Sequence, residues 1–262
     1  LAERVPFIVP EESYGHPLAD RPAAIAYRDL SRTVAELGDA GRRWGRVFRP
    51  LVEQLDGVLD FTGSQLLRVP HAPLTAARFG WRVGVGSLGP AGGFDGDAGA
   101  LFAGVAAHTI GPKPALAGTG TGLVLGTHAH AGGWGLPLGG SAAIAAALAA
   151  EIRDAGGEIV AGVQVRTPGE VGDSRVTLLD TGPEFLATYA GDELPGGYRR
   201  ALRRFRHGDA AAKLDAALDG PIPWRDPRLA RVPTVHLGGT AREIAAAERA
   251  VAAGRIPDRP YV

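Results

Sequence analysis

The segment from Pro137 to Val165 has the clearest pattern of apolar and polar positions in the chain. A glycine pair lies near its start, followed by Ser141, a residue type that commonly caps a helix. Apolar residues then recur at four-residue spacing, which predicts an amphipathic helix over 141–155 that packs on a sheet through one stripe. This stripe consists of Ile144, Leu148 and Ile152.

Extended structure is expected directly after this helix. Gly156 and Gly157 can adopt the left-handed turn that ends a helix. The runs at 158–160 and 163–166 are rich in β-branched residues and predict a short strand that continues extended. The segment should therefore form a loop, a helix, a turn and a strand.

The remaining elements are expected to be helices with a few strands between them. Thr240 and Glu243 form a capping box, which predicts a last helix ending near Ala252. Residues 1–30 and 83–100 are expected to be irregular. Apolar periodicity predicts helices at 31–38, 39–59, 72–79, 98–107, 115–129 and 183–189, and strands at 175–179, 211–218 and 232–237.

Composition and charge narrow the classes of function. The 262 residues include 28 basic and 28 acidic side chains, so no net field favours nucleic acid as a partner. Cysteine is absent, which excludes disulfides, thiolate metal sites and cysteine nucleophiles. No apolar run is long enough to cross a bilayer, and we expect a soluble, cytoplasmic chain without a transmembrane segment. Methionine is also absent, which indicates a fragment or a processed piece.

Three short motifs suggest chemistry that their surroundings do not support. Gly84–Gly89 has the sequence G-x-G-x-x-G, but no strand is expected before it and no helix after it, so we predict a surface loop without a nucleotide. His128 and His130 need a third or fourth ligand to hold zinc, and no carboxylate or cysteine lies near them in sequence. We therefore predict no metal site. Ser141 is explained as a helix cap, because no serine stands in a G-x-S-x-G sequence.

The segment 137–165 resembles a motif of the phytoene-desaturase-like FAD-dependent oxidoreductases, which belong to the flavin amine oxidase superfamily. In that family a Pro-x-Gly-Gly-Ser loop begins a helix that leads to a strand beside the nucleotide of the flavin. Segments 16–38, 213–224 and 234–240 also resemble the family, in its order and at about its spacing. The resemblance covers the middle of such an enzyme, because the amino-terminal Rossmann glycine loop and the carboxy-terminal flavin segment are absent.

The resemblance implies a mixed α/β fold of the α+β kind. It would combine part of a Rossmann-like FAD domain with a helical and mixed-sheet substrate domain. Residues 1–136 would form a largely helical substrate or cap region. Residues 137–183 would be the segment of the FAD-binding domain, and residues 184–262 would add strands and a helix to the substrate domain.

The resemblance also implies contacts to the cofactor at five positions. The loop at Gly139 and Gly140 would lie near the flavin, and the backbone of Val165 would contact the adenosine part. Gly182 and Pro183 stand where a family strand ends beside the cofactor, with the usual threonine displaced by one place.

Three residues are candidates to line the substrate cavity, namely His130, Lys213 and His236. His130 is equally well explained as a hydrogen-bonded core histidine, and the other two could equally face solvent. Because the chemistry of such enzymes belongs to the flavin, we assign no catalytic acid or base.

We thus expect the central part of an oxidoreductase that moves hydride equivalents on an apolar, isoprenoid-like substrate. Its partner would be the remainder of the flavin-binding domain, with peripheral membrane contact left open. The alternative is a non-catalytic binding or scaffold fragment that keeps the substrate-domain shape without a cofactor. In either case the chain alone should not hold FAD tightly, because it lacks the glycine loop and helix that bind the pyrophosphate.

Overall fold

The computed structural model describes residues 3–65, 68–89 and 91–262 and divides the chain into two compact units. The larger unit comprises 3–143 with 211–262, and the smaller unit comprises 144–210. The fold is of the α+β class, with many helices and two small antiparallel sheets. The division into three functional segments that is expected from the sequence stays a prediction.

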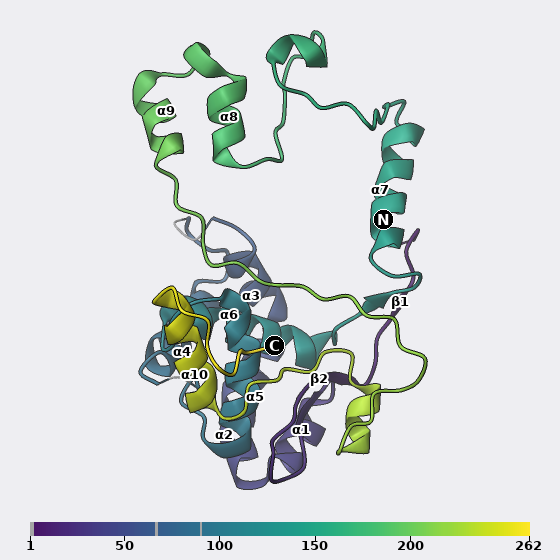
Figure 1. The fold of residues 1–262 in the computed structure, drawn as a ribbon. Helices are drawn as coiled ribbons and strands as arrows, with labels where there is room; N and C mark the ends of the chain where they lie inside the picture. Colours follow the sequence, from purple (N-terminus) through teal and green to yellow (C-terminus); the bar gives the residue numbers. More distant parts are fainter. Residues whose placement is uncertain (1–2, 66–67, 90) are drawn as a thin grey trace. The chain divides into compact units, whose positions relative to one another are not determined.

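Most helices of the larger unit gather around one core (Figure 1). Its helices are α1 (Leu30–Glu36), α2 (Gly41–Val52), α3 (Leu55–Thr62), α4 (Pro73–Gly86), α5 (Gly96–Ala106), α6 (Leu116–Ala131) and α10 (Ala241–Ala252). Short 3-10 turns lie at Gly38–Ala40, Ala107–Thr109 and Pro227–Arg231. Among the described helices, none has both the length and the apolar content needed to span a bilayer.

The first thirty residues contain strands, so the prediction of an irregular segment is wrong. Strand β2 (Glu12–His16) pairs antiparallel with β3 (Ala24–Tyr27), and β1 (Phe7–Ile8) pairs antiparallel with β4 (Leu136–Pro137). Every residue of β2 and β3 is buried. A strand covered on both faces needs no alternation of apolar and polar residues, which is why the period-two signal is missing.

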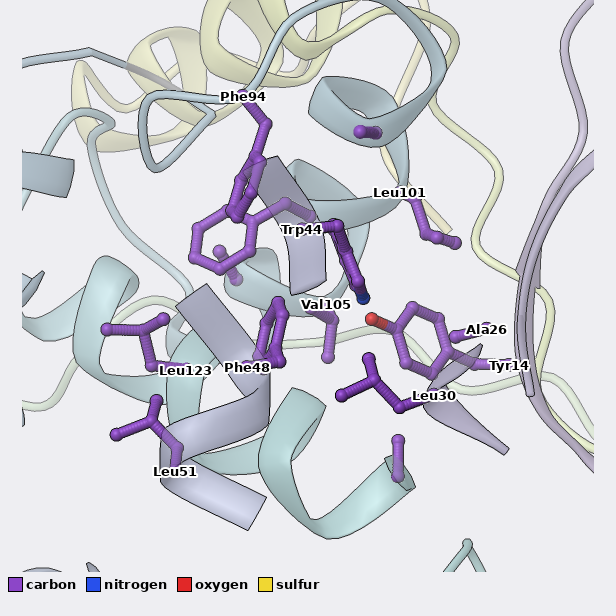
Figure 2. Close-up of a cluster of buried hydrophobic side chains, with 14 of the residues drawn as sticks. Tyr14, Ala26, Leu30, Trp44, Phe48, Leu51, Phe94, Leu101, Val105 and Leu123 are labelled. Atoms are coloured by element: carbon purple, nitrogen blue, oxygen red, sulfur yellow. The ribbon is translucent and has the colours of Figure 1, made fainter. Parts of the chain in front are cut away.

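Aromatic rings form the centre of the larger unit's core. The ring centroids of Trp44 and Phe48 lie 4.6 Å apart, and those of Trp44 and Phe94 lie 4.9 Å apart. Phe94 in turn lies 5.2 Å from Phe102 of α5. Figure 2 shows how Trp44, Phe48 and Phe94 come together beside Tyr14 of β2. These tilted arrangements are the geometry that aromatic pairs prefer.

The predicted helices are largely confirmed, with shifted ends. Helix α8 (Pro183–Tyr189) and the capping box of α10 lie where the sequence places them. Helix α7 (Ala142–Asp154) matches the prediction for 141–155. The expected loop at 83–100 is wrong at its start, because Gly84 and Gly86 form the last turn of α4.

The smaller unit has helices but no sheet. It contains nearly all of α7, then α8 and α9 (Gly196–Arg203), with 3-10 turns at Pro168–Val171 and Gly191–Glu193. Within 144–210, all of which the structure describes, no residue is in a strand and the buried residues are Ala147 and Ala187. The strands predicted at 158–160, 163–166 and 175–179 are therefore wrong for this structure, since a strand requires a hydrogen-bonded partner.

The stripe of α7 is likewise not buried. Leu148 is 49% exposed and Ile152 is 46% exposed, and Ile144 is only half-buried. The prediction that these side chains pack on a sheet is wrong here, because there is no sheet in this unit to receive them. The spacing predicts the helix correctly but not its packing.

Two further strand predictions also fail. Residues 211–218 are exposed and without regular structure. Residues 232–237 make only a single bridge, in which Val235 lies parallel to Gly15 of β2. The bridge is held by hydrogen bonds from the amide of Gly15 to the carbonyl of Thr234 and from the amide of His236 to the carbonyl of Gly15, both 2.9 Å.

Close packing requires glycine at Gly122 and Gly126, and Gly118 lies against the flexible side chain of Lys113. A Cβ atom at Gly118 would lie 3.0 Å from the Lys113 side chain, at Gly122 2.7 Å from the Phe102 ring, and at Gly126 2.6 Å from the Phe48 ring. Gly120 differs, because its nearest neighbour would be a methyl group of Val83 at an ordinary 3.8 Å. Packing within the protein therefore does not explain Gly120.

Alanine substitutions at neighbouring glycines should consequently have opposite effects. We expect Gly120→Ala to raise the free energy of unfolding by about 1 kcal/mol, because alanine favours a helix and nothing obstructs its methyl group. Gly122→Ala should lower it by about 1–3 kcal/mol, because the buried Phe102 ring must move. Urea unfolding of the two variants measures both, and a loss of stability at Gly120 would contradict this account.

Candidate functional site

An apolar groove of about 690 Å³ lies between α3, α4 and α6 in the larger unit. Its wall includes aromatic and aliphatic side chains from all three helices and two glycines from helix interiors. The lining residues are Leu59, Phe61, Thr62, Gly63, Phe79, Gly80, Val83, Leu116, Ala117, Gly120, Thr121, Val124, Leu125 and His128. This size and composition are typical of a site for a small apolar ligand.

Close packing at one end of α3 brings its groove-lining residues toward α4. A Cβ atom at Gly57 would lie 3.0 Å from Ala72 and 3.1 Å from Thr75, so the two helices approach closely there. The hydroxyl of Thr75 donates a 2.9 Å hydrogen bond to the side-chain oxygen of Gln54. Further along, the rings of Phe61 and Phe79 meet edge to face at 6.1 Å.

The two interior glycines give the groove its width. A Cβ atom at Gly80 would meet nothing within 4 Å, and one at Gly120 would touch only Val83. Both residues lie in helices, where glycine costs about 1 kcal/mol relative to alanine. Both glycines therefore leave space in the groove. Alanine would stabilise either helix, and no neighbouring atom of the protein would obstruct its methyl group.

His128 is the titratable side chain in the lining of the groove. No described residue forms a hydrogen bond with its imidazole, whereas the hydroxyl of Thr62 donates to the carbonyl of Val58 within its own helix. His128 can therefore donate to or accept from a ligand. The sequence suggests for His128 only the role of a metal ligand with His130, although its spacing from Ala117, Thr121 and Val124 places all four on one face of a helix.

His130 lies in the core and not in the groove. Its Nε2 accepts a 2.9 Å hydrogen bond from the indole of Trp44, and its Nδ1 donates to the carbonyl of Tyr27 at 2.7 Å. Burial lowers the pKa of His130 to about 4, so the ring is neutral. Of the two explanations left open by the sequence, the structure places this residue as a hydrogen-bonded core histidine.

His236 belongs to a separate cluster of histidine and aromatic rings. Its Nε2 lies 2.9 Å from Nε2 of His108, so one ring donates to the other. His16 Nε2 donates to the carbonyl of Gly239 at 2.6 Å. Around them lie the rings of Tyr14, Trp134 and Tyr261, each within about 6.3 Å of His236.

Two ring nitrogens in this cluster have no partner. The Nδ1 atoms of His16 and His236 are buried and make no hydrogen bond. Burial, together with the neighbouring His108 and His16, lowers the pKa of His236 to about 3. In the part of the chain that the structure describes, no three histidine or acidic side chains converge as metal ligands. The cluster is therefore a neutral one at pH 7.

Lys213 lies neither in the groove nor in the histidine cluster. Its side chain is exposed and forms a 2.8 Å ion pair with Asp215, in a segment without strand structure. A role in a cavity thus has no geometric support here.

The positions expected to contact FAD fit that cofactor only in part. Gly139 and Gly140 both have positive φ, and a Cβ atom at Gly140 would meet nothing within 4 Å, so their backbone is accessible. Val165 lies in irregular chain and not in a strand. Gly182 precedes α8, with Pro183 as its first residue. The loop can therefore approach a cofactor, whereas the expected adenosine contact lacks its strand.

Comparison with known proteins adds no identification. No model of a known protein family matches the sequence, and neither the curated proteins nor the solved structures contain a significant match. Function must therefore be inferred from the residues of the chain and their geometry.

The neutral buried histidines should make stability depend on pH. The unfolded chain binds protons near pH 6.5, whereas folded His130 and His236 do so only near pH 4 and 3. Their contribution is therefore complete above pH 6.5 and is lost as the pH falls below it, by up to about 1.4 kcal/mol per pH unit for each histidine.

This dependence can be measured by urea unfolding between pH 7 and 5. His130→Gln and His236→Gln should each make the free energy of unfolding fall less steeply, whatever their effect at pH 7. The carboxylates are common to all three proteins and cancel in the comparison. Slopes equal to that of the unsubstituted chain would show that neither ring is held neutral by the fold.

Proposed function

We propose that this chain is the central part of an FAD-dependent, phytoene-desaturase-like oxidoreductase that acts on an apolar substrate. The observation that carries the substrate half of the proposal is the groove between α3, α4 and α6. The cofactor half is supported by the resemblance of 137–165 to the family's loop and helix, and by the accessible backbone of Gly139 and Gly140.

The groove favours a ligand that binds by burial of apolar surface. Each 100 Å² of apolar surface removed from water contributes about 2.5 kcal/mol, and side chains such as Phe61, Phe79 and Leu125 offer no competing polar groups. His128 and Thr121 are the polar side chains left to orient a ligand at the wall. The residues of this chain would hold the substrate and exclude water from it.

The flavin would supply the redox chemistry when bound in the parent protein. No acid or base of this chain is assigned to that chemistry. Because the chain lacks the glycine loop that opens a helix for the pyrophosphate, we expect the remainder of the flavin-binding domain to provide the anchor.

The smaller unit favours a partner of this kind. It has β-branched and aliphatic residues in exposed, irregular segments, as expected for strands without neighbours. These residues are Ile159, Val160, Val163, Val176 and Leu178. Strands from the remainder of the flavin-binding domain would give them backbone partners and cover their side chains.

A non-catalytic binding fragment remains the second candidate. The groove lies wholly within the larger unit, so it can bind an apolar ligand whether or not a flavin is present. Separate experiments on the groove and on the cofactor loop therefore distinguish the two functions.

The groove can be tested with the fluorescent apolar dye Nile red. We expect the dye to bind the 262-residue chain, and Gly120→Leu to weaken binding by about tenfold or more, equivalent to about 1.4 kcal/mol, because the new side chain enters the groove. Gly197→Leu is the matched control, since Gly197 is a helical glycine with nothing within 4 Å and lies outside the groove. Equal affinities for both variants would refute binding in this groove.

The cofactor can be tested by absorbance after gel filtration. We expect the chain alone to be colourless and its complex with the remainder of the flavin-binding domain to retain flavin bands. Gly140→Val should reduce the retained flavin, whereas Gly156→Val imposes the same strained positive φ away from the loop and should not. A colourless complex with an intact dye site would instead favour the non-catalytic fragment.

A further inference from the structure

A pocket of about 910 Å³ lies between two segments of the larger unit and shares no lining residue with the groove. One segment, 17–23, joins β2 to β3, and the other is 224–229. The apolar part of the wall comes from Leu18, Trp224 and Leu229 and from three prolines. This volume is in the range of sites for small organic molecules.

Hydrogen bonds between side chains and backbone hold the two segments of the pocket together. The guanidinium of Arg225 donates to the carbonyl of Ala19. The carboxylate of Asp226 accepts from the amide of Ala23 at 2.9 Å, and Arg228 donates to the carbonyl of the same residue, also at 2.9 Å. The pocket is therefore formed before a ligand enters, so binding does not require the wall to become ordered.

The apolar wall rests on a small hydrophobic core of its own. Leu229 is buried and packs with Ala23, Ile25 and Tyr27. Trp224 packs against this cluster but stays half-buried, and no described residue accepts a hydrogen bond from its indole N–H. The indole therefore offers a ligand both an apolar face and a donor.

Arg225 carries a positive charge that no described carboxylate balances. The lining contains three arginines and two aspartates. Arg228 and Asp226 form a bidentate pair at 3.0 and 2.7 Å, and these hydrogen bonds lower the pKa of Asp226 to about 2, so the two charges cancel at neutral pH. Beyond its bond to a backbone carbonyl, Arg225 has two side-chain nitrogens that contact no described acceptor.

Arg21 adds further donors beside this charge. Its Nε lies 3.4 Å from a carboxylate oxygen of Asp20 and 3.3 Å from one of Asp97. The two terminal nitrogens of the same guanidinium form no hydrogen bond with a described residue. The pocket thus combines an apolar wall with free donors from two guanidinium groups.

We propose that this pocket binds a small amphipathic anion, in which a single carboxylate is attached to an apolar body. Arg225, assisted by Arg21, would bind the carboxylate, because a planar guanidinium matches its two oxygens. Trp224 and Leu18 would cover the apolar body. The site is separate from the groove and does not depend on a flavin.

Charge and composition favour this ligand over simpler ones. A bare anion such as inorganic phosphate would leave the apolar wall in contact with water, so it would gain nothing from burial. A neutral apolar molecule would remove water from Arg225 without supplying a partner for its charge. Only a ligand with both parts matches the wall and the free donors together.

The dyes anilinonaphthalenesulfonate and phenylnaphthylamine test the proposal, because they share an apolar body and differ by the anionic sulfonate. Both are measured on the Gly120→Leu chain, whose groove is obstructed, so the pocket and the groove are judged separately. Arg225→Gln should weaken binding of the sulfonate dye about tenfold or more and change the affinity of the neutral dye less than about twofold. Arg225→Lys keeps the charge and should lose less, and added salt should weaken the sulfonate dye alone.

Two further variants separate charge recognition from the architecture of the pocket. Arg21→Gln leaves the bond between Arg225 and Ala19 in place and should still weaken the sulfonate dye, by about threefold. Arg255→Gln removes an exposed arginine outside the pocket and should bind both dyes unchanged.

Competition identifies the ligand class. Octanoate should displace the sulfonate dye, whereas octanol and inorganic phosphate should not. Equal displacement by octanol would indicate a purely apolar surface, and equal displacement by inorganic phosphate would indicate a bare anion site; either result would overturn the proposal. So would a sulfonate dye that does not bind, or that binds Arg225→Gln and Arg255→Gln equally.

Discussion

The larger unit depends on the two hydrogen bonds of one buried imidazole. His130 of α6 receives the indole N–H of Trp44 from α2 and donates to the carbonyl of Tyr27 in β3, so three elements distant in sequence meet at one ring. A buried polar group without a partner costs about 1–3 kcal/mol, and each of these groups would be left unpaired if the others moved. The hydrogen bond orients the indole of Trp44, and the rings of Phe48, Phe94 and Phe102 pack around it.

The sequence predicts the features that depend on neighbouring residues and misses those that depend on contacts distant in sequence. Helix α8 and the capping box of α10 follow from residues within a few positions of each other, and local rules predict them closely. Strands β2 and β3 depend on burial on both faces, which leaves no alternation to detect. The strands expected after α7 show the reverse error, since β-branched residues favour a strand but residues 144–210 provide no partner strand.

The apolar ligand stays a prediction, and the structure does not bring the expected cavity residues to the groove. An apolar ligand was expected from the resemblance, yet the expected cavity residues lie elsewhere: His130 in the core, His236 in a histidine cluster and Lys213 in solvent. Helix α6 is apolar on nearly every side, so its periodicity cannot separate the face that packs on Phe102 from the face that lines the groove. The neighbouring side chains distinguish the two faces: the Phe102 ring packs against Gly122, whereas only Val83 lies near Gly120.

Exposed apolar residues have different physical causes in the two units. On α4 the exposed residues Leu74, Trp81, Val85 and Leu88 follow one line along the helix and the turn after it. In 144–210 they are β-branched residues in irregular chain, with backbone groups that a sheet would satisfy. The first pattern belongs to one side of a helix whose backbone groups are already paired, and the second belongs to irregular chain without strand pairing. Burial of side chains alone would therefore complete the first pattern, whereas the second also needs backbone hydrogen bonds.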